Sequence, residues 1–202
     1  MINKTIRDIH LSGKKVLVRV DFNVPFKPDT NEISSLNRII ASLPTIRYLI
    51  EENASVVLCS HLGRPKGVFN KDLSLSLIIP KLQALLGINV KFSSSLDISD
   101  IKKEISELLP KEVMLLENLR FYSEEELNDK DFSKRLAGLA DVFVNDAFGV
   151  SHRAHASVCG ITNWIPSVSG LLLETINRPT INNATAGIIK YFFSIQKFTK
   201  LN

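Results

Sequence analysis

Five short apolar runs, rich in β-branched residues, recur along the first 145 residues of this 202-residue chain. Runs of this length and composition are typical of buried β-strands. Strands that alternate with helices form βαβ units, so the sequence predicts an α/β fold with a parallel sheet covered by helices on both faces. The expected strands are Lys15–Val20, Ser55–Ser60, Asn89–Phe92, Val113–Glu117 and Asp141–Asn145.

Helical patterns lie between most of these strands, with apolar residues three and four positions apart. Ser99 is expected to cap the third helix. Ser123 and Glu126 have the spacing of a capping box, which predicts a helical start at Ser123. The expected helices are Asn37–Glu52, Leu73–Leu86, Asp100–Leu109 and Asp131–Ala140.

The basic excess of the chain lies at its C-terminal end. The chain has 25 Lys+Arg against 21 Asp+Glu, a net charge of +4. No acidic residue follows Glu174, whereas four basic residues do, so residues 1–174 are neutral overall. A neutral body without a basic stripe argues against nucleic-acid binding. The change in composition predicts a domain over residues 1–174 and an unrelated tail over residues 175–202, disordered or frameshifted.

The two cysteines stand far apart, with no His or Cys at ligand spacing, which supports neither a disulfide framework nor a metal site. Cys59, inside an apolar run, is expected to be a buried and unreactive thiol. The N-terminus lacks the pattern of a secretory signal, and no segment has the ~20 apolar residues of a membrane helix. We therefore expect a cytoplasmic protein that binds no membrane and no metal.

Polar and basic residues follow four of the five predicted strands. In open α/β sheets, ligands bind beyond the carboxyl ends of the strands. Arginine suits phosphate and carboxylate because its planar guanidinium makes paired, charge-assisted hydrogen bonds and stays charged. The sequence therefore predicts a site for a small polyanion at this edge. The residues expected there are Asp21, Asn23, His61, Arg64, Arg120 and Arg153 after strands, and Arg38 at the start of the first long helix.

Each of these residues also has a structural interpretation. A single arginine after a strand is usually solvated or ion-paired, and His61 is equally well interpreted as a structural histidine. Asp21 and Asp146 are alternatively partners of the arginines or helix caps. The repetition of the same chemistry at four strand ends is what favours a binding site. The chain has no Gly-x-x-x-x-Gly-Lys-Ser/Thr and no Gly-x-Gly-x-x-Gly motif, so no standard nucleotide cradle is predicted.

Five ordered segments resemble those of phosphoglycerate kinases, over about residues 5–174. The resemblance implies a Rossmann-like fold, the N-terminal domain of a two-domain cytoplasmic enzyme that acts as a monomer. It also implies a glycolytic reaction, the reversible phosphoryl transfer between 1,3-bisphosphoglycerate and ADP that gives 3-phosphoglycerate and ATP. The segments are Val18–Pro25 (VRVDFNVP), Asn37–Leu49 (NRIIASLPTIRYL), Ser60–Gly67 (SHLGRPKG), Leu115–Phe121 (LLENLRF) and Val144–Ser157 (VNDAFGVSHRAHAS).

The same resemblance implies roles for particular residues. Arg38 resembles the family's catalytic arginine, which stabilises charge on the phosphoryl group in flight. The implied substrate contacts are Asp21, Asn23, Arg38, His61, Arg64, Arg120 and Arg153. In this family Mg-ATP and Mg-ADP bind to the C-terminal domain, whose Gly-Gly-Ala-Lys segment and glycine-rich loop do not occur after Glu174. We therefore expect this chain to bind the triose without turnover. The alternative is a non-catalytic binding or regulatory module for a small phosphorylated acid.

Overall fold

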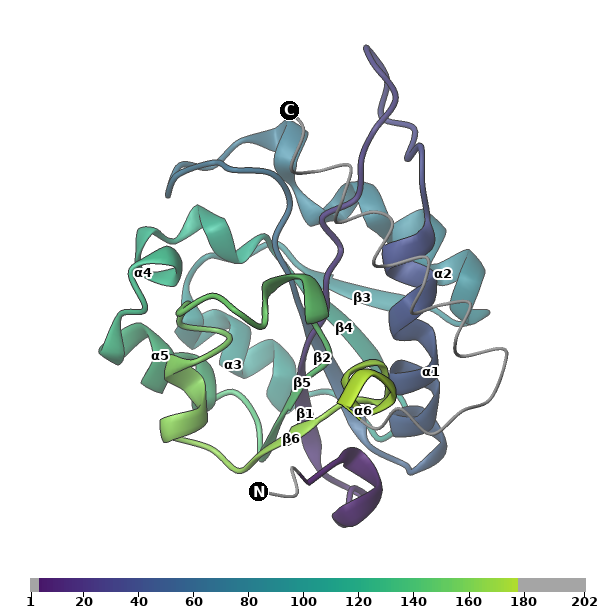
Figure 1. Cartoon of the computed structure of the whole chain (residues 1–202), viewed down its shortest axis with the longest axis vertical. Helices are drawn as coiled ribbons and strands as arrows, with labels where there is room; N and C mark the ends of the chain where they lie inside the picture. Colours follow the sequence, from purple (N-terminus) through teal and green to yellow (C-terminus); the bar gives the residue numbers. More distant parts are fainter. Residues whose placement is uncertain (1–3, 178–202) are drawn as a thin grey trace.

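Six parallel strands form one sheet in the order β3-β4-β2-β1-β5-β6 (Figure 1). The computed structural model describes residues 4–177. The α/β class and the five expected strands are confirmed, with bounds that shift by one or two residues. A sixth strand, only three residues long, was not predicted because so short a run carries no periodicity. The strands are β1 Lys15–Arg19, β2 Ser55–Cys59, β3 Val90–Ser93, β4 Val113–Leu116, β5 Val142–Asn145 and β6 Ser167–Ser169.

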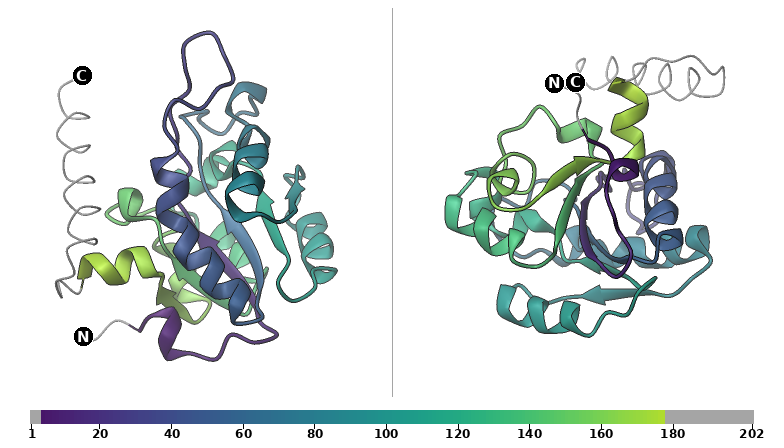
Figure 2. Two further views of the ribbon diagram at one scale, coloured as in Figure 1. Left: turned by 90° about the vertical axis from the view of Figure 1, so that its right-hand side faces the viewer. Right: turned by 90° about the horizontal axis from the view of Figure 1, so that it is seen from below.

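Helices cover both faces of the sheet, as predicted, because alternate residues of the central strands face different cores. In β1, Val16 and Val18 pack in one cluster with residues of α1 (Asn37–Glu51) and α2 (Ile79–Leu86). Leu17 packs on the opposite face with residues of α3 (Ile98–Ser106) and α5 (Lys130–Ala137). The two helical layers flank the sheet in Figures 1 and 2.

The helix expected over Leu73–Leu86 is shorter than predicted. Two 3₁₀ turns, η2 (Lys71–Leu73) and η3 (Leu75–Ile78), come first, and the α-helix begins only at Ile79. Pro80 explains the late start, because proline has no N–H to donate and its ring clashes with the carbonyl group four residues earlier. Proline fits the first turn of a helix without loss of a hydrogen bond, and Pro80 lies there.

Two predicted caps are wrong. Helix α3 is capped by Asp97, whose Oδ1 accepts from the Ser99 N–H at 2.7 Å, so Ser99 lies inside the helix. Ser123 is the first residue of α4 (Ser123–Glu126) and not its cap, and its hydroxyl donates to the neighbouring Glu124 at 3.1 Å. Glu126, the other half of the expected capping box, forms an ion pair with Arg120 at 3.2 Å. Glu126 therefore pairs with a charged side chain outside the helix and does not complete a capping box.

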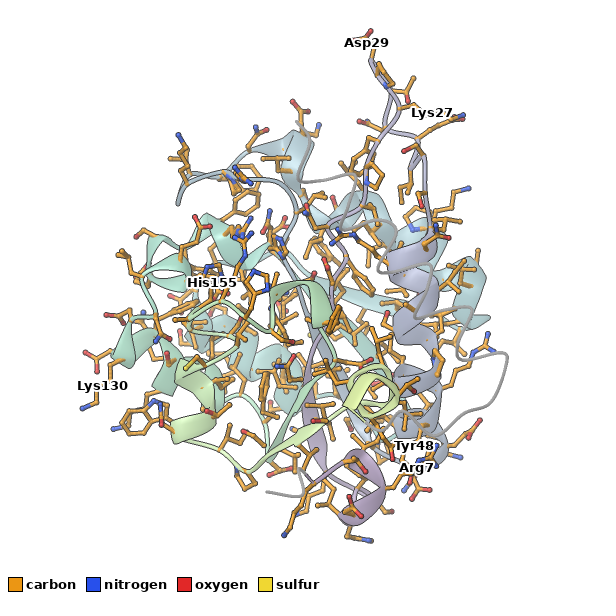
Figure 3. The ribbon with its side chains drawn as sticks, viewed as in Figure 1. Arg7, Lys27, Asp29, Tyr48, Lys130 and His155 are labelled. Carbon is orange, nitrogen blue, oxygen red and sulfur yellow. The ribbon has the colours of Figure 1, made fainter. Side chains whose placement is uncertain are left out.

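The last described helix, α6 (Leu171–Asn177), packs beside α1 (Figure 2). A 3₁₀ turn near the N-terminus, η1 (Ile6–Asp8), ties both together. The Arg7 guanidinium lies 5.2 Å from the centre of the Tyr48 ring of α1 and 3.4 Å from the Glu174 carboxylate of α6 (Figure 3). Helix α6 continues past Glu174, and most of the expected tail, residues 178–202, lies outside the described residues. The domain boundary therefore stays a prediction.

Between β1 and α1 the chain makes a long excursion before it returns to the sheet. Phe26 and Ile33 pair as an isolated antiparallel bridge, and the arm between them carries Lys27 and Asp29 at its tip (Figure 3). This arm joins two parts of the predicted site, the turn after β1 and the first turn of α1. The parallel sheet places the ends of β1, β2, β4 and β5 at one edge, which is where the other predicted site residues follow.

Candidate functional site: an arginine cluster at the carboxyl edge of the sheet

Arg38 and Asp21 form an ion pair at this edge. Arg38 lies in the first turn of α1, and its Nη1 donates to Oδ2 of Asp21, in the turn that follows β1. Arg38 is partly exposed and Asp21 is buried. Of the two structural roles predicted for Asp21, an arginine partner or a helix cap, the structure shows the arginine partner. No other side-chain hydrogen bond of Arg38 occurs within residues 4–177, so most of its donors are open to a ligand.

Asn23 and Arg120 hold the loop after β2 from two sides. Oδ1 of Asn23 accepts from the backbone N–H of Gly63 at 2.9 Å, and Nη1 of Arg120 donates to the carbonyl oxygen of Gly63 at 2.7 Å. Gly63 has a φ of +62°, and a Cβ atom there would lie 2.6 Å from the Leu73 side chain, so the position favours glycine. This loop then leads directly to Arg64.

Asn118 fastens the same loop from below. Its Nδ2 donates to the carbonyl oxygens of Leu62 at 2.7 Å and Leu73 at 2.9 Å. Its Oδ1 accepts from the N–H groups of Leu62 at 3.2 Å and Arg120 at 3.0 Å. Asn118 is fully buried. One amide side chain therefore sets the loop after β2 against the turn that carries Arg120. Sequence reasoning missed Asn118, although it stands two residues after β4 in the LLENLRF segment.

His61 lies at the centre of the cluster and is buried. Burial, followed by the positive charges of Arg19, Arg120, Arg38 and Arg153, lowers the pKa of His61 well below 6.5. Charges act on a buried ring over several ångströms, so Arg120, Arg38 and Arg153 lie in the neighbourhood of His61, whereas Arg19 contacts it directly. Three of the four predicted arginines, Arg38, Arg120 and Arg153, are thus brought together around His61.

Arg19 is a member of the cluster that sequence reasoning missed. It ends β1, is 1% exposed, and its Nη1 donates to the carbonyl oxygen of Val20 at 2.9 Å. Its Nη2 lies 3.1 Å from Nδ1 of His61. The sequence did contain a signal for Arg19, because it is a charged residue inside the apolar run KVLVRV, and a buried arginine is almost always paired with another group.

Arg64 and Arg153 carry the exposed charge of the site. Arg64 is exposed and Arg153 half-buried, and the side chains of both make no hydrogen bond or ion pair within the part of the chain that the structure describes. Arg153 acts electrostatically on His61, Arg120 and His155. Arg64 follows the loop that Asn23 and Arg120 hold.

An acidic group lies beneath the arginines. Glu125 of α4 is buried and accepts from the Ser157 hydroxyl at 2.5 Å and from the Ser157 N–H at 3.0 Å. Burial raises the pKa of Glu125, while the charge of Arg19 and the bonds from Ser157 oppose that shift. Nδ1 of His155, labelled in Figure 3, lies 4.0 Å from Glu125. One buried carboxyl therefore helps to offset several buried or half-buried cations.

The last part of the site is Asp146, at the end of β5. It is 1% exposed, and its Oδ1 accepts from the N–H of Leu172 at 3.0 Å, at the start of α6. The predicted alternative of a helix cap is therefore realised for Asp146. Gly170 allows this approach, because a Cβ atom there would overlap the Asp146 carboxyl group.

The remaining sequence expectations concern thiols, metals and membranes. Cys59 is fully buried as predicted, and burial raises its pKa to about 12. Among residues 4–177, no three His, Cys, Asp or Glu side chains come together as a metal would require. No helix within the described range is long and apolar enough to cross a membrane.

Comparison with known proteins agrees with this geometry. Residues 6–180 match the model of the family described as phosphoglycerate kinase. The phosphoglycerate kinase of Desulforudis audaxviator is 51% identical over 174 residues, and that of Dictyoglomus turgidum is 52% identical over 177 residues. Each alignment covers 86% of this chain and 44% of the relative, so the chain spans less than half the length of these relatives.

Solved structures give the same result. The phosphoglycerate kinase of Coxiella burnetii superposes with a TM-score of 0.77 at 34% identity, over 86% of this chain and 43% of that one. The enzyme of Pyrococcus horikoshii superposes with a TM-score of 0.77 at 35% identity, over 85% of this chain and 43% of that one. An arginine cluster at the carboxyl edge of a six-stranded parallel sheet, together with these matches, shows that the chain belongs to the phosphoglycerate kinase family.

Proposed function

We propose that this chain is the triose-binding half of a phosphoglycerate kinase and that its arginine cluster binds 3-phosphoglycerate and 1,3-bisphosphoglycerate. The observation that carries the proposal is the convergence of Arg19, Arg38, Arg120 and Arg153 on a buried, neutral His61. The cluster holds more cationic groups than the Asp21, Glu125 and Glu126 carboxylates beside it can neutralise. A small ligand with both phosphate and carboxylate groups supplies the missing negative charge.

Within the proposed reaction, the chain's own residues bind and orient the acid. Arg120, Arg153 and Arg64 hold the phosphate and carboxylate of the triose, and His61 and Asn23 shape the loop beneath it. Arg38, with donors not used by Asp21, stabilises charge on the phosphoryl group in transfer. The attacking group in the ATP-consuming direction is a carboxylate that is already ionised at neutral pH. This explains why a site rich in arginine and poor in general bases suits the reaction.

The nucleotide is placed on a second domain of the full-length enzyme. The described residues contain neither a metal-binding cluster nor a glycine-rich phosphate loop, and we expect Mg-ATP and Mg-ADP to bind to that second domain. Phosphoryl transfer requires that donor and acceptor be brought in line and shielded from water. We therefore expect the chain alone to bind triose without ATP-dependent turnover. Its cytoplasmic location and monomeric state remain predictions.

A calorimetric titration with 3-phosphoglycerate tests the binding step. Arg153→Ala should weaken binding by about 1.5–3 kcal/mol, the usual contribution of a hydrogen bond to a charged group, and Arg64→Ala by a similar or smaller amount. Arg135→Ala is the matched control, because it removes the same charge from an exposed position of α5 whose guanidinium pairs with Glu124 at 3.7 Å. Equal affinities for wild type, Arg153→Ala and Arg135→Ala would refute the assigned site.

A coupled kinase assay separates the proposed function from the alternative of a non-catalytic binding module. A separately produced nucleotide domain of a relative, added to the chain, should restore ATP-dependent turnover if the chain is half of a kinase. The restored activity should be lost in Arg38→Ala. Binding of 3-phosphoglycerate without any restored turnover favours the binding module. Substantial turnover by the chain alone would contradict our expectation for the isolated chain.

A further inference from the structure

A small cavity lies beside the Asp21–Arg38 ion pair. Its volume is about 10 Å³, close to the minimum that one water molecule needs. The cavity lies between the first turns of α1 and the start of α6. Its walls are Asp21, Arg38, Ser42, Asp146, Phe148, Gly149 and Leu172.

Asp146 contributes a carboxyl group to this cavity that is only half satisfied. Its Oδ1 accepts from the Leu172 N–H at 3.0 Å, and hydrogen bonds with the Thr45 side chain and the Leu173 backbone also stabilise the charged carboxylate. Its Oδ2 is buried and has no hydrogen-bond partner among the described residues. A buried carboxylate oxygen without a donor is costly, and such groups in proteins are usually satisfied by ordered water. Oδ2 of Asp146 can therefore accept a further hydrogen bond from a water molecule in the cavity.

Arg38 has unused hydrogen-bond donors beside the cavity. Its guanidinium has five N–H donors, and only Nη1 has a described partner. One water molecule can accept from Arg38 and donate to a carboxylate oxygen at the same time. We propose that Asp146 is a second carboxylate partner of Arg38, reached through one water molecule in this cavity, and that it fixes the guanidinium in the orientation that binds the anion. Asp146 is then a positioning residue, which acts through Arg38 and does not touch the ligand.

The position of Asp146 makes this link sensitive to pH. Burial raises its pKa to about 7, so the carboxyl group changes charge in the neutral range. The charged residues on the elements that pack around it are Arg38, Arg47 and Glu51 on α1, Lys15 and Arg19 on β1, Asp21 just after β1, and Glu174 on α6, whereas β6 and η5 (Phe148–Val150) carry none. Of these, Arg38 and Asp21 line the cavity together with Asp146. An ionised Asp146 attracts the Arg38 cation through the water, and a protonated one does so far less. We therefore expect Arg38 to be held more firmly above pH 7 than below it.

The test follows the Arg38 side chain directly, with no ligand present. In the full chain labelled with ¹⁵N, the Arg38 guanidinium signal, assigned by its loss in Arg38→Lys, should shift with a midpoint near pH 7. Asp146→Asn keeps the size of the side chain and an acceptor for Leu172, but it removes the charge. This variant should lose the transition. Glu174→Gln is the matched control, because it weakens the anchoring of α6 through Arg7 and leaves the cavity unchanged.

A second arm measures the affinity for 3-phosphoglycerate and rests on the proposed function. The dissociation constant of Asp146→Asn, divided by that of wild type, should be close to one at about pH 6. At about pH 8 it should rise to on the order of fivefold, as for the loss of one net hydrogen bond. The ratio cancels the titration of the ligand itself. If Asp146 were only a negative charge near the site, removing it would tighten binding, so the direction of the change decides the question.

The outcomes separate the two proposals. An Arg38 signal without a midpoint near pH 7 in wild type, or one that survives in Asp146→Asn, overturns the positioning role. So does tighter binding by Asp146→Asn at high pH, or the same loss in Glu174→Gln. If wild type does not bind 3-phosphoglycerate, the proposed function fails and the Arg38 titration still decides the inference. If Asp146→Asn does not fold, the wild-type titration decides it alone.

Discussion

Nη2 of Arg19 lies 3.1 Å from Nδ1 of His61, and both side chains are buried. A guanidinium group can only donate hydrogen bonds, so Nδ1 must accept and the imidazole proton must be on Nε2. Burial and the neighbouring arginines lower the pKa of His61 well below 6.5, in agreement with this tautomer. His61 is therefore a neutral ring among cations, with its Nε2–H left as a hydrogen-bond donor.

Stability at acid pH provides a test of this state. The unfolded chain binds a proton at His61 near pH 6.5, and the folded chain does so only at much lower pH. The contribution of His61 to stability is thus fully present above pH 6.5 and is lost as pH falls below it. His61→Gln should reduce the loss of unfolding free energy between about pH 7 and pH 5, measured by urea denaturation. The exposed His10→Gln is the control, and an equal effect of both variants would contradict the neutral His61.

Asn118 should be the most sensitive amide in the domain. Its side chain makes four hydrogen bonds to the backbone of the loop after β2 and of its own turn. Asn118→Ala leaves several buried backbone groups unsatisfied, each at a cost of about 1–3 kcal/mol, so we expect a destabilisation of roughly 3 kcal/mol or more in urea unfolding. Asn163→Ala, at an exposed position with one 3.1 Å bond to Gly160, should cost less than about 1 kcal/mol. Similar losses in the two variants would show that Asn118 does not organise the site.

Gly149 should be required for the Asp21–Arg38 ion pair. A Cβ atom at this position would lie 2.5 Å from Oδ2 of Asp21 and 3.6 Å from Nη1 of Arg38, so the Asp21 carboxylate would have to move. We expect Gly149→Ala to weaken 3-phosphoglycerate binding by at least about tenfold, as when a hydrogen bond to a charged group is lost. In the control Gly138→Ala, the new Cβ atom meets the carbonyl oxygens of Arg135 at 3.4 Å and Lys134 at 3.7 Å, with no side chain of the site nearby. Unchanged affinity in Gly149→Ala would separate the ion pair from binding.

The two thiols should differ sharply in reactivity. Cys159 is exposed, whereas Cys59 is buried with a pKa raised to about 12. Because the thiolate is the reactive form, a disulfide reagent at about pH 8 should modify one thiol rapidly in the folded chain and the second only after unfolding. Cys159→Ser should abolish the rapid phase, and Cys59→Ser should leave it intact. Rapid modification of both thiols in wild type would mean that the core around β2 opens readily.

Local sequence patterns were sufficient to predict the α/β class and five of the six strands. Strand β2, Ser55–Cys59, is buried at every position and reads as a continuous apolar run, which is how a strand covered on both faces appears. Where two local signals competed, the sequence was misleading. Ser99 has the chemistry of a cap, but Asp97, two residues earlier, accepts the hydrogen bond from its N–H. Ser123 and Glu126 have the spacing of a capping box, but Glu126 is drawn to Arg120.

The site also divides into features that the sequence predicted and features that it did not. Sequence patterns alone show that cationic and polar side chains follow the strands, and a parallel sheet brings the carboxyl ends of those strands to one edge. Which of these side chains meet depends on the folded chain. The fold brings Arg19, at the end of β1, against His61, Asp21 against Arg38, and Asp146 against the start of α6. Periodicity reports which face of an element is buried. The pairing of charges depends on distances between segments far apart in the chain, and those are set only when the sheet assembles.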